Sequence, residues 1–149
     1  KKLFYAYYFD PCVREEGNKS DQLKINDTYV EIVAEVQEKM RCDLERYHIA
    51  IETNPTSNLC ISTMKRYDEH PILRFNNDGL TLSKAYKPHC IPVTINTDDS
   101  GVFETDIRRE FSLMALALEK NKDMKNSPRK IYDWLDNIRK MAYVQRFYK

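Results

Sequence analysis

Two adjacent carboxylates, Asp98 and Asp99, follow directly after the apolar stretch at residues 91–96. Adjacent side chains point in different directions, so one carboxylate could bind a metal ion while the other contacts a substrate. The alternative is structural, in which either aspartate forms a turn or caps the helix that follows. The pair alone leaves both interpretations open.

A second polar segment, ETNPTSN at residues 52–58, follows another short apolar stretch. Its small side chains, among them Asn54, Ser57 and Asn58, could line a pocket, or the segment could be a turn that ends a strand. In α/β folds the groups that perform chemistry gather at the carboxyl ends of the strands. Two parallel strands would therefore bring both segments to one edge of a sheet.

The other candidate groups have weaker patterns. The histidines, His48, His70 and His89, follow no metal-binding spacing. The four cysteines stand 18 to 30 residues apart, without the paired spacing of a zinc site or a disulfide scaffold. The sequence has neither a Gly-rich phosphate loop nor a G-x-S-x-G motif. We expect reduced, mostly buried thiols and no metal role for any single histidine.

Apolar spacing and end signals predict the elements that position these segments. The clearest helix begins at Asn26 or Asp27, and the last begins at Ser127, with Pro128 in its first turn. The remaining predictions are an aromatic helix ending before Asp10 that packs its tyrosines, a loop over 14–24, strands over 48–53 and 91–96, a polar turn over 56–58, a helical turn at 65–67, a short helix over 71–75 and a helix over 104–120.

This order predicts an α/β fold, and the apolar second strand favours a parallel sheet. Two strands alone do not form a stable sheet, so the pattern indicates part of a larger sheet or barrel. The length of 149 residues suits one partial domain, residues 1–149.

The charge balance argues against a general binder of polyanions, because 24 Lys and Arg residues face 23 Asp and Glu residues. Nucleic-acid binding through the tyrosines and the basic C-terminal end is therefore the weakest interpretation. No apolar run approaches the roughly 20 residues of a membrane helix. We expect a cytoplasmic protein with no membrane partner.

The segments ETNPTSNL, HPILRF and VTINTDDSGVFETDIRREF, in this order, resemble the C-terminal part of the adenosine deaminase family. That family is a zinc-dependent branch of the amidohydrolase superfamily, whose hydrolases are built on a (β/α)8 TIM barrel. The likeness covers residues 49–111, and TINTDDSGVF is its most specific part. It implies that the chain is the C-terminal portion of such a barrel, about strands 7 and 8 with their flanking helices, and is incomplete on its own.

The resemblance also implies a role for each matching residue. Asp98 matches the metal-binding aspartate, which orients and deprotonates the attacking water, and Asp99 matches the aspartate that hydrogen-bonds a purine ring nitrogen. Asn54, Ser57 and Asn58 match the pocket rim, as substrate contacts or as support for strand 7. The implied cofactor is one Zn²⁺ ion. The implied reaction of purine metabolism is hydrolytic deamination of a purine nucleoside or nucleotide.

The sequence departs from the family pattern in two matching positions. Asn54 stands where many members have Cys, and Ser100 replaces the usual Pro after the Asp pair. The N-P-T-S-N form and the long aromatic segment before it resemble the larger, divergent bacterial members. Some of those belong to antiphage systems, so the resemblance extends to a role in defence.

The family's histidine motifs, H-x-H, H-A-x-x-E and a further histidine on strand 6, do not occur in this sequence. We expect the missing N-terminal part of the barrel or a partner chain to supply them, and we expect the chain alone to be inactive. The alternative is a non-catalytic remnant or assembly module that uses the same fold pieces for protein contacts. Exposed strand edges predict self-association.

Overall fold

The computed structural model describes residues 1–20, 25–81 and 86–146. They belong to two compact units, Lys1–Glu35 and Val36–Lys149. The candidate site residues all lie in the second unit. A helix that begins in the first unit ends in the second, so the boundary falls within that helix.

The first unit begins with α1 (Lys2–Phe9) and α2 (Pro11–Gly17), which are separated by Asp10. Asp10 caps α2, because its Oδ1 accepts the backbone N–H of Cys12 at 2.9 Å. The predicted loop over 14–24 was therefore wrong for residues 14–17, while residues 21–24 lie outside the described residues.

The aromatic side chains of α1 were expected to pack into a core, and this expectation was wrong. The helix has no buried residue. Its rings contact one another instead, as in the pair Phe4 and Tyr8, whose centroids lie 4.6 Å apart. Burial of such side chains needs a partner that a helix of this length cannot supply by itself.

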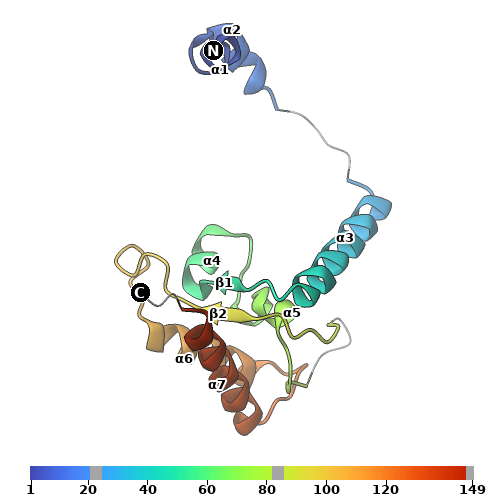
Figure 1. The fold of residues 1–149 in the computed structure, drawn as a ribbon, viewed down its shortest axis with the longest axis vertical. Coiled ribbons are helices and arrows are strands. Elements are labelled where there is room, and N and C mark those ends of the chain that lie inside the picture. Colours follow the sequence, from blue (N-terminus) through green and yellow to red (C-terminus); the bar gives the residue numbers. More distant parts are fainter. Residues whose placement is uncertain (21–24, 82–85, 147–149) are drawn as a thin grey trace. The chain divides into compact units, whose positions relative to one another are not determined.

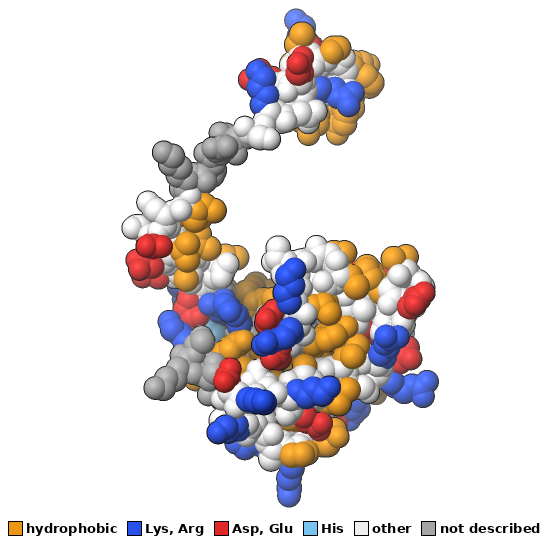
Figure 2. Space-filling model, turned by 180° about the vertical axis from the view of Figure 1, so that it is seen from behind, with side chains coloured by type: hydrophobic (Ala, Val, Ile, Leu, Met, Phe, Trp, Pro, Cys, Tyr) orange, Lys and Arg blue, Asp and Glu red, His pale blue; other side chains and the backbone are white. Residues whose placement is uncertain are grey.

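The next helix, α3 (Asp27–Arg46), begins where the sequence predicted. Asn26 caps it, because its Oδ1 accepts the backbone N–H of Tyr29 at 2.8 Å. Several apolar side chains of α3, including Ile32, Val36 and Met40, are about half exposed, and Figure 2 shows such orange side chains along this helix.

The second unit contains a sheet of two parallel strands, β1 (Ile51–Thr53) and β2 (Val93–Ile95). Ile51 pairs with Val93 and Thr53 with Ile95. The parallel pairing that the sequence predicted is confirmed, although both strands are shorter than expected. The other described elements of this unit are helical. They are α4 (Pro55–Ile61), the 3-10 helix η1 (Tyr67–Glu69), α5 (Ile72–Phe75), α6 (Ile107–Lys120) and the long α7 (Pro128–Gln145).

The hydrophobic core lies between β2 and the two C-terminal helices. Figure 1 shows α6 and α7 on one side of the sheet, with α7 in contact with β2. Trp134 is 1% exposed, and its indole N–H donates to the carbonyl and to Oδ1 of Asn76, both at 3.2 Å. The predicted start of α7 is confirmed, since Ser127 Oγ accepts the backbone N–H of Lys130 at 3.4 Å.

His89 attaches the C-terminal half of α3 to the segment before β2. Its Nδ1 lies 3.1 Å from Glu45 Oε2, and its Nε2 lies 3.3 Å from both carboxylate oxygens of Glu38. The pKa of Glu38 is lowered to about 2, mainly by the hydrogen bond from the Arg41 guanidinium. Desolvation acts in the opposite direction, and hydrogen bonds with His89 and Lys87 lower the pKa further. These contacts hold the C-terminal half of α3 against the segment that precedes β2.

The four cysteines are free and exposed, so the expectation of buried thiols was wrong. Among the described residues, no helix is both long and apolar enough to cross a membrane.

Candidate active site

The two polar segments follow neighbouring strands and begin at the same edge of the sheet. The backbone N–H of Asn96 donates to the carbonyl of Thr53 at 2.8 Å, which extends the pairing beyond Ile95. The Thr53 hydroxyl also donates to the carbonyl of Thr94 at 2.7 Å. The juxtaposition predicted from the sequence is therefore confirmed, and the carboxyl ends of both strands open toward one region.

Asp98 lies three residues beyond β2 in an unusual backbone conformation. Its φ is 57°, in the left-handed region that few residues other than glycine adopt, although aspartate tolerates it better than most. The side chain is exposed, and its Oδ2 accepts the hydroxyl of Ser57 at 2.7 Å. This contact joins the segment after β1 to the segment after β2.

Ser57 stands on α4, where the sequence analysis expected a polar turn over 56–58. That prediction was wrong, because Pro55 begins a helix: its fixed φ suits the first turn and its missing N–H is not needed there. Asn54 is the N-cap but makes no side-chain capping hydrogen bond. The first turn of α4 therefore depends on groups from elsewhere in the fold.

Asn58 is held by a buried histidine. His70 Nδ1 accepts the backbone N–H of Ile72 at 3.1 Å, so its Nε2 carries the proton and donates to Asn58 Oδ1 at 3.0 Å. The same oxygen accepts the backbone N–H of Asn54 at 3.2 Å. Desolvation lowers the pKa of His70 to about 4, against a smaller upward effect of the Glu110 carboxylate. His70 is therefore neutral at neutral pH.

Asp99 shapes the turn after Asp98. Its Oδ1 accepts the backbone N–H groups of Gly101 and Val102, both at 3.1 Å. Neither aspartate caps the next helix, because Asp106 does so by accepting the N–H groups of Arg108 and Arg109. The turn alternative thus holds for Asp99 and the helix-cap alternative for neither residue.

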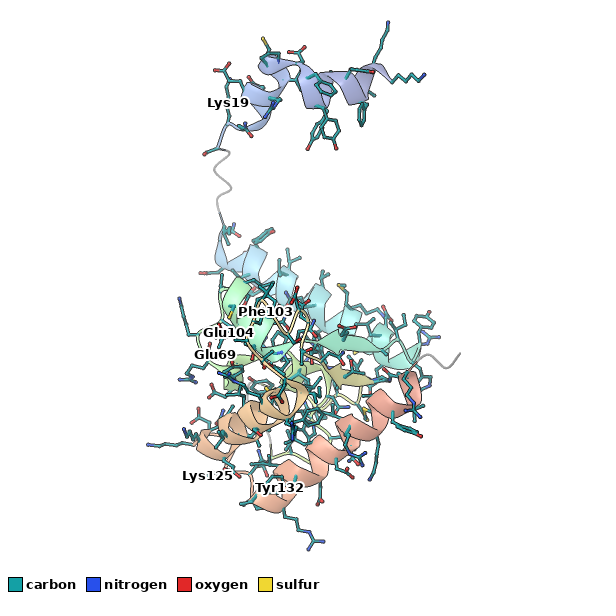
Figure 3. The ribbon with its side chains drawn as sticks, turned by 90° about the vertical axis from the view of Figure 1, so that its left-hand side faces the viewer. Lys19, Glu69, Phe103, Glu104, Lys125 and Tyr132 are labelled. Atoms are coloured by element: carbon teal, nitrogen blue, oxygen red, sulfur yellow. The ribbon has the colours of Figure 1, made fainter. Side chains whose placement is uncertain are left out.

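The segment between β2 and α6 is closed by backbone contacts. The N–H of Phe103 donates to the carbonyl of Asp99 at 3.0 Å, and the N–H of Thr105 donates to that of Ser100 at 3.2 Å. Figure 3 labels Phe103 and Glu104 in this segment, and Arg109 Nη1 donates to the carbonyl of Glu104 at 2.9 Å. The positions of Asp98 and Asp99 are thereby set by local hydrogen bonds.

Asn54 carries a buried acceptor without a partner. Its Oδ1 has no hydrogen-bond partner among the described residues, although it lies at the carboxyl end of β1. A buried polar atom of this kind is costly unless a donor satisfies it. The expected donor is a further part of the fold or a ligand.

Asp98 fits a metal ion as a single ligand. It is an exposed carboxylate, and Oδ1 accepts no hydrogen bond from the described residues. The described part of the chain contains no group of three or more His, Cys, Asp or Glu side chains placed to hold a metal. A zinc site has about four ligands, so a zinc ion bound to Asp98 would need further ligands from outside the described residues.

Comparison with protein families settles the relationship. The adenosine deaminase family model matches residues 25–127, which include both polar segments and both strands. This chain belongs to the adenosine deaminase family. The match begins just before α3, so α1 and α2 lie outside it.

Three curated relatives share the matched region. The aminodeoxyfutalosine deaminase of Streptomyces coelicolor is 35% identical over 80 residues, which are 54% of this chain and 18% of the relative. That of Streptomyces avermitilis is 32% identical over 81 residues, 54% of this chain and 20% of the relative. The adenosine deaminase of Shewanella denitrificans is 37% identical over 71 residues, 48% of this chain and 18% of the relative.

The matched part of the chain thus spans about a fifth of the length of these curated relatives. No solved structure matches the chain. All three of these relatives are deaminases by name.

The structure places two further residues, His70 and Glu110, beside the candidate site residues. His70 lies before Pro71 in HPILRF, one of the three segments that resemble the family. The segment therefore pointed to His70, although the sequence assigned it no role. Glu110 gave no signal, because it stands among charged residues in IRREF and yet is completely buried. Burial of a carboxylate is decided by the tertiary structure and is not visible in local sequence.

Proposed function

We propose that this chain forms the C-terminal part of a zinc-dependent purine deaminase of the adenosine type. In this proposal β1 and β2 are strands 7 and 8 of a (β/α)8 barrel, and residues 1–149 form one partial domain. The Ser57–Asp98 contact carries the proposal, because it places an oriented, exposed carboxylate at the carboxyl ends of two parallel strands.

The short sheet supports the assignment to a larger barrel. Within the described residues β1 and β2 pair only with each other, so each strand has an edge without a strand partner. A (β/α)8 barrel needs roughly 200 residues or more. The preceding strands, in the same protein or in a partner chain, would pair with these edges and supply the remaining metal ligands.

Each proposed site residue has a separate task. Asp98 holds the ion through its carboxylate and takes a proton from the attacking water, while Ser57 fixes the orientation of Asp98. Asp99 keeps Oδ2 for a hydrogen bond with a purine ring nitrogen. A bound Zn²⁺ would lower the pKa of a water molecule so that hydroxide could add to C6 of adenine, and the amino group would take up a proton and leave as ammonia.

Asn54 and Asn58 support the pocket rim in this proposal. Asn58 is engaged by His70 and by the backbone of Asn54, which suits support of α4 more directly than substrate contact. The unpaired Oδ1 of Asn54 remains for a donor from the substrate or from the preceding strand. A role in antiphage defence is a prediction from resemblance only.

The decisive experiment compares aspartate variants of the complete barrel, in which the other ligands are present. Asp98→Ala should abolish zinc-dependent deamination of adenosine, a loss of about 10³-fold or more. Asp99→Ala should retain zinc and lower kcat/KM for adenosine by about 10- to 100-fold, because the hydrogen bond to the purine ring nitrogen, whose proton is shared between the two acceptors, is lost.

Asp78→Ala is the matched control, because Asp78 is an exposed aspartate in the turn after α5. It should leave both zinc content and kcat/KM unchanged. Undiminished turnover in Asp98→Ala would refute the assignment of Asp98 and, with it, the proposed site.

A second candidate function is an assembly module, favoured by the exposed aromatic side chains of α1, of which Tyr7 is 69% and Phe9 is 66% exposed. The first unit lies largely outside the family match and does not contain the candidate site. Light scattering of the purified chain across a concentration series would show self-association. Association together with failure of the complete barrel to bind zinc would favour this candidate.

A further inference from the structure

Glu110 is a completely buried carboxylate that the proposed chemistry does not use. It lies in the first turn of α6 and is 0% exposed. A buried carboxylate is stable only when hydrogen bonds replace its hydration. Each of its two carboxylate oxygens accepts a hydrogen bond from a different segment of the site.

The first contact reaches α4. Glu110 Oε2 accepts the backbone N–H of Thr56 at 2.9 Å. Thr56 follows Pro55 in the first turn of α4, where the N-cap Asn54 makes no side-chain capping hydrogen bond. Glu110 therefore caps α4, although it lies 54 positions after Thr56 in the sequence.

The second contact reaches the segment after β2. Glu110 Oε1 accepts the hydroxyl of Thr105, which is itself 8% exposed. Thr105 lies at the end of the turn that Asp98 and Asp99 begin, and its N–H closes that turn on the carbonyl of Ser100. One carboxylate thus holds the segments that follow β1 and β2.

The Ser57–Asp98 hydrogen bond spans these two segments. Ser57 is the residue after Thr56, and its hydroxyl reaches Asp98 Oδ2 at 2.7 Å. Any separation of α4 from the turn after β2 would break this contact. We infer that Glu110 is a positioning residue that sets the geometry of the Ser57–Asp98 pair, an inference whose link to metal binding rests on the proposed function.

The test uses substitutions of Glu110 that differ only in hydrogen bonding. Glu110→Gln can keep both contacts, since its carbonyl accepts from Thr56 and its amide donates to the Thr105 hydroxyl, which can rotate to accept. Glu110→Met has a similar shape and keeps neither. Glu119→Met, at an exposed position near the end of the same helix, is the control.

The first readout is hydrogen exchange and NMR of the full chain, which needs neither metal nor activity. Glu110→Met should accelerate exchange of the Thr56 amide by about tenfold or more and shift the Asp98 signals, because a buried donor loses its acceptor. Glu110→Gln and Glu119→Met should behave like the unsubstituted chain. Unchanged Asp98 signals and amide exchange in a folded Glu110→Met would overturn the inference.

Thr105→Val keeps the test decisive if Glu110→Met does not fold, because it removes one contact alone. It should accelerate exchange of the Thr105 amide and shift the Asp98 signals, and no change in either would overturn the inference.

The second readout is zinc affinity of the complete barrel, which Glu110→Met should weaken by about 10- to 100-fold and Glu110→Gln should restore. Unaltered zinc affinity in Glu110→Met would overturn the role in the metal site. If the unsubstituted complete barrel binds no zinc, the proposed function fails, whereas the exchange result still decides whether Glu110 positions the pair.

Discussion

The hydroxyl of Ser57 donates to the carboxylate of Asp98 across 41 positions of sequence, at an Oγ–Oδ2 distance of 2.7 Å. It joins the two segments that follow the parallel strands of the sheet. The contact leaves Oδ1 of Asp98 without a hydrogen bond from the described residues. Orientation of a ligand by a neighbouring donor is how proteins commonly tune metal sites.

Ser57→Ala should therefore weaken zinc binding by the complete barrel by about 10- to 100-fold without unfolding it. The reason is that Asp98 loses the donor that fixes its carboxylate, while the alanine fits the space of the serine. Competition titration with a zinc indicator measures the effect. Ser112→Ala is the control, since Ser112 is an exposed serine whose hydroxyl donates to the carbonyl of Arg108 within α6. Equal zinc affinity in Ser57→Ala and Ser112→Ala would contradict this role.

Acidification should lower the stability of the chain through His70. Burial lowers the pKa of His70 to about 4, whereas the unfolded value is about 6.5. Below pH 6.5 the unfolded state binds a proton that the folded state does not, so stability falls as the pH drops toward 4. The contribution lost between pH 7 and pH 5 is about 2 kcal/mol.

Urea unfolding at several pH values measures this dependence. His70→Gln should be less stable than the unsubstituted chain at pH 7, and the difference between the two should shrink as the pH falls to 5. The other histidines, His48 and His89, are common to both proteins and cancel in the comparison. A difference that stays constant from pH 7 to pH 5 would show that His70 titrates normally in the folded state.

Trp134 should dominate the stability of the second unit. It is almost completely buried beside Asn76 and contributes two hydrogen bonds from its indole N–H. Trp134→Ala should lower the free energy of unfolding by about 3–5 kcal/mol, because it leaves a cavity. Tyr132→Ala, two positions earlier and 58% exposed, should change it by about 0.5 kcal/mol or less (Figure 3).

Circular dichroism is the appropriate probe for this pair, since Trp134 is the single tryptophan and its fluorescence is lost on substitution. Comparable losses of stability in the two variants would contradict the position of Trp134 in the core.

Local signals in the sequence were sufficient where a short stretch of chain decides the structure. Asn26 and Ser127 begin their helices as predicted, because an N-cap acts on its own first turn. The apolar residues 91–96 also predicted the buried strand β2, because the burial of this short strand is visible in its own residues. The two site segments could be placed at one edge of the sheet because parallel strands end on the same side.

The sequence was insufficient where distant residues decide. Residues 56–58 have small polar side chains that favour turns, yet they form part of α4 because Glu110 caps Thr56 and His70 holds Asn58. Neither contact is visible in the local pattern. The aromatic residues of α1 were wrongly expected to be buried, because a pattern shows a tendency to pack without showing whether a partner is present.

The position of zinc relative to Asp98 is the most direct test of the proposed function. Anomalous diffraction at the zinc edge, on crystals of the complete barrel grown with Zn²⁺, would locate the ion. We predict one zinc peak with a carboxylate oxygen of Asp98 at about 2.0–2.2 Å. A zinc ion coordinated without Asp98, or no zinc peak at the carboxyl ends of β1 and β2, would contradict the proposal.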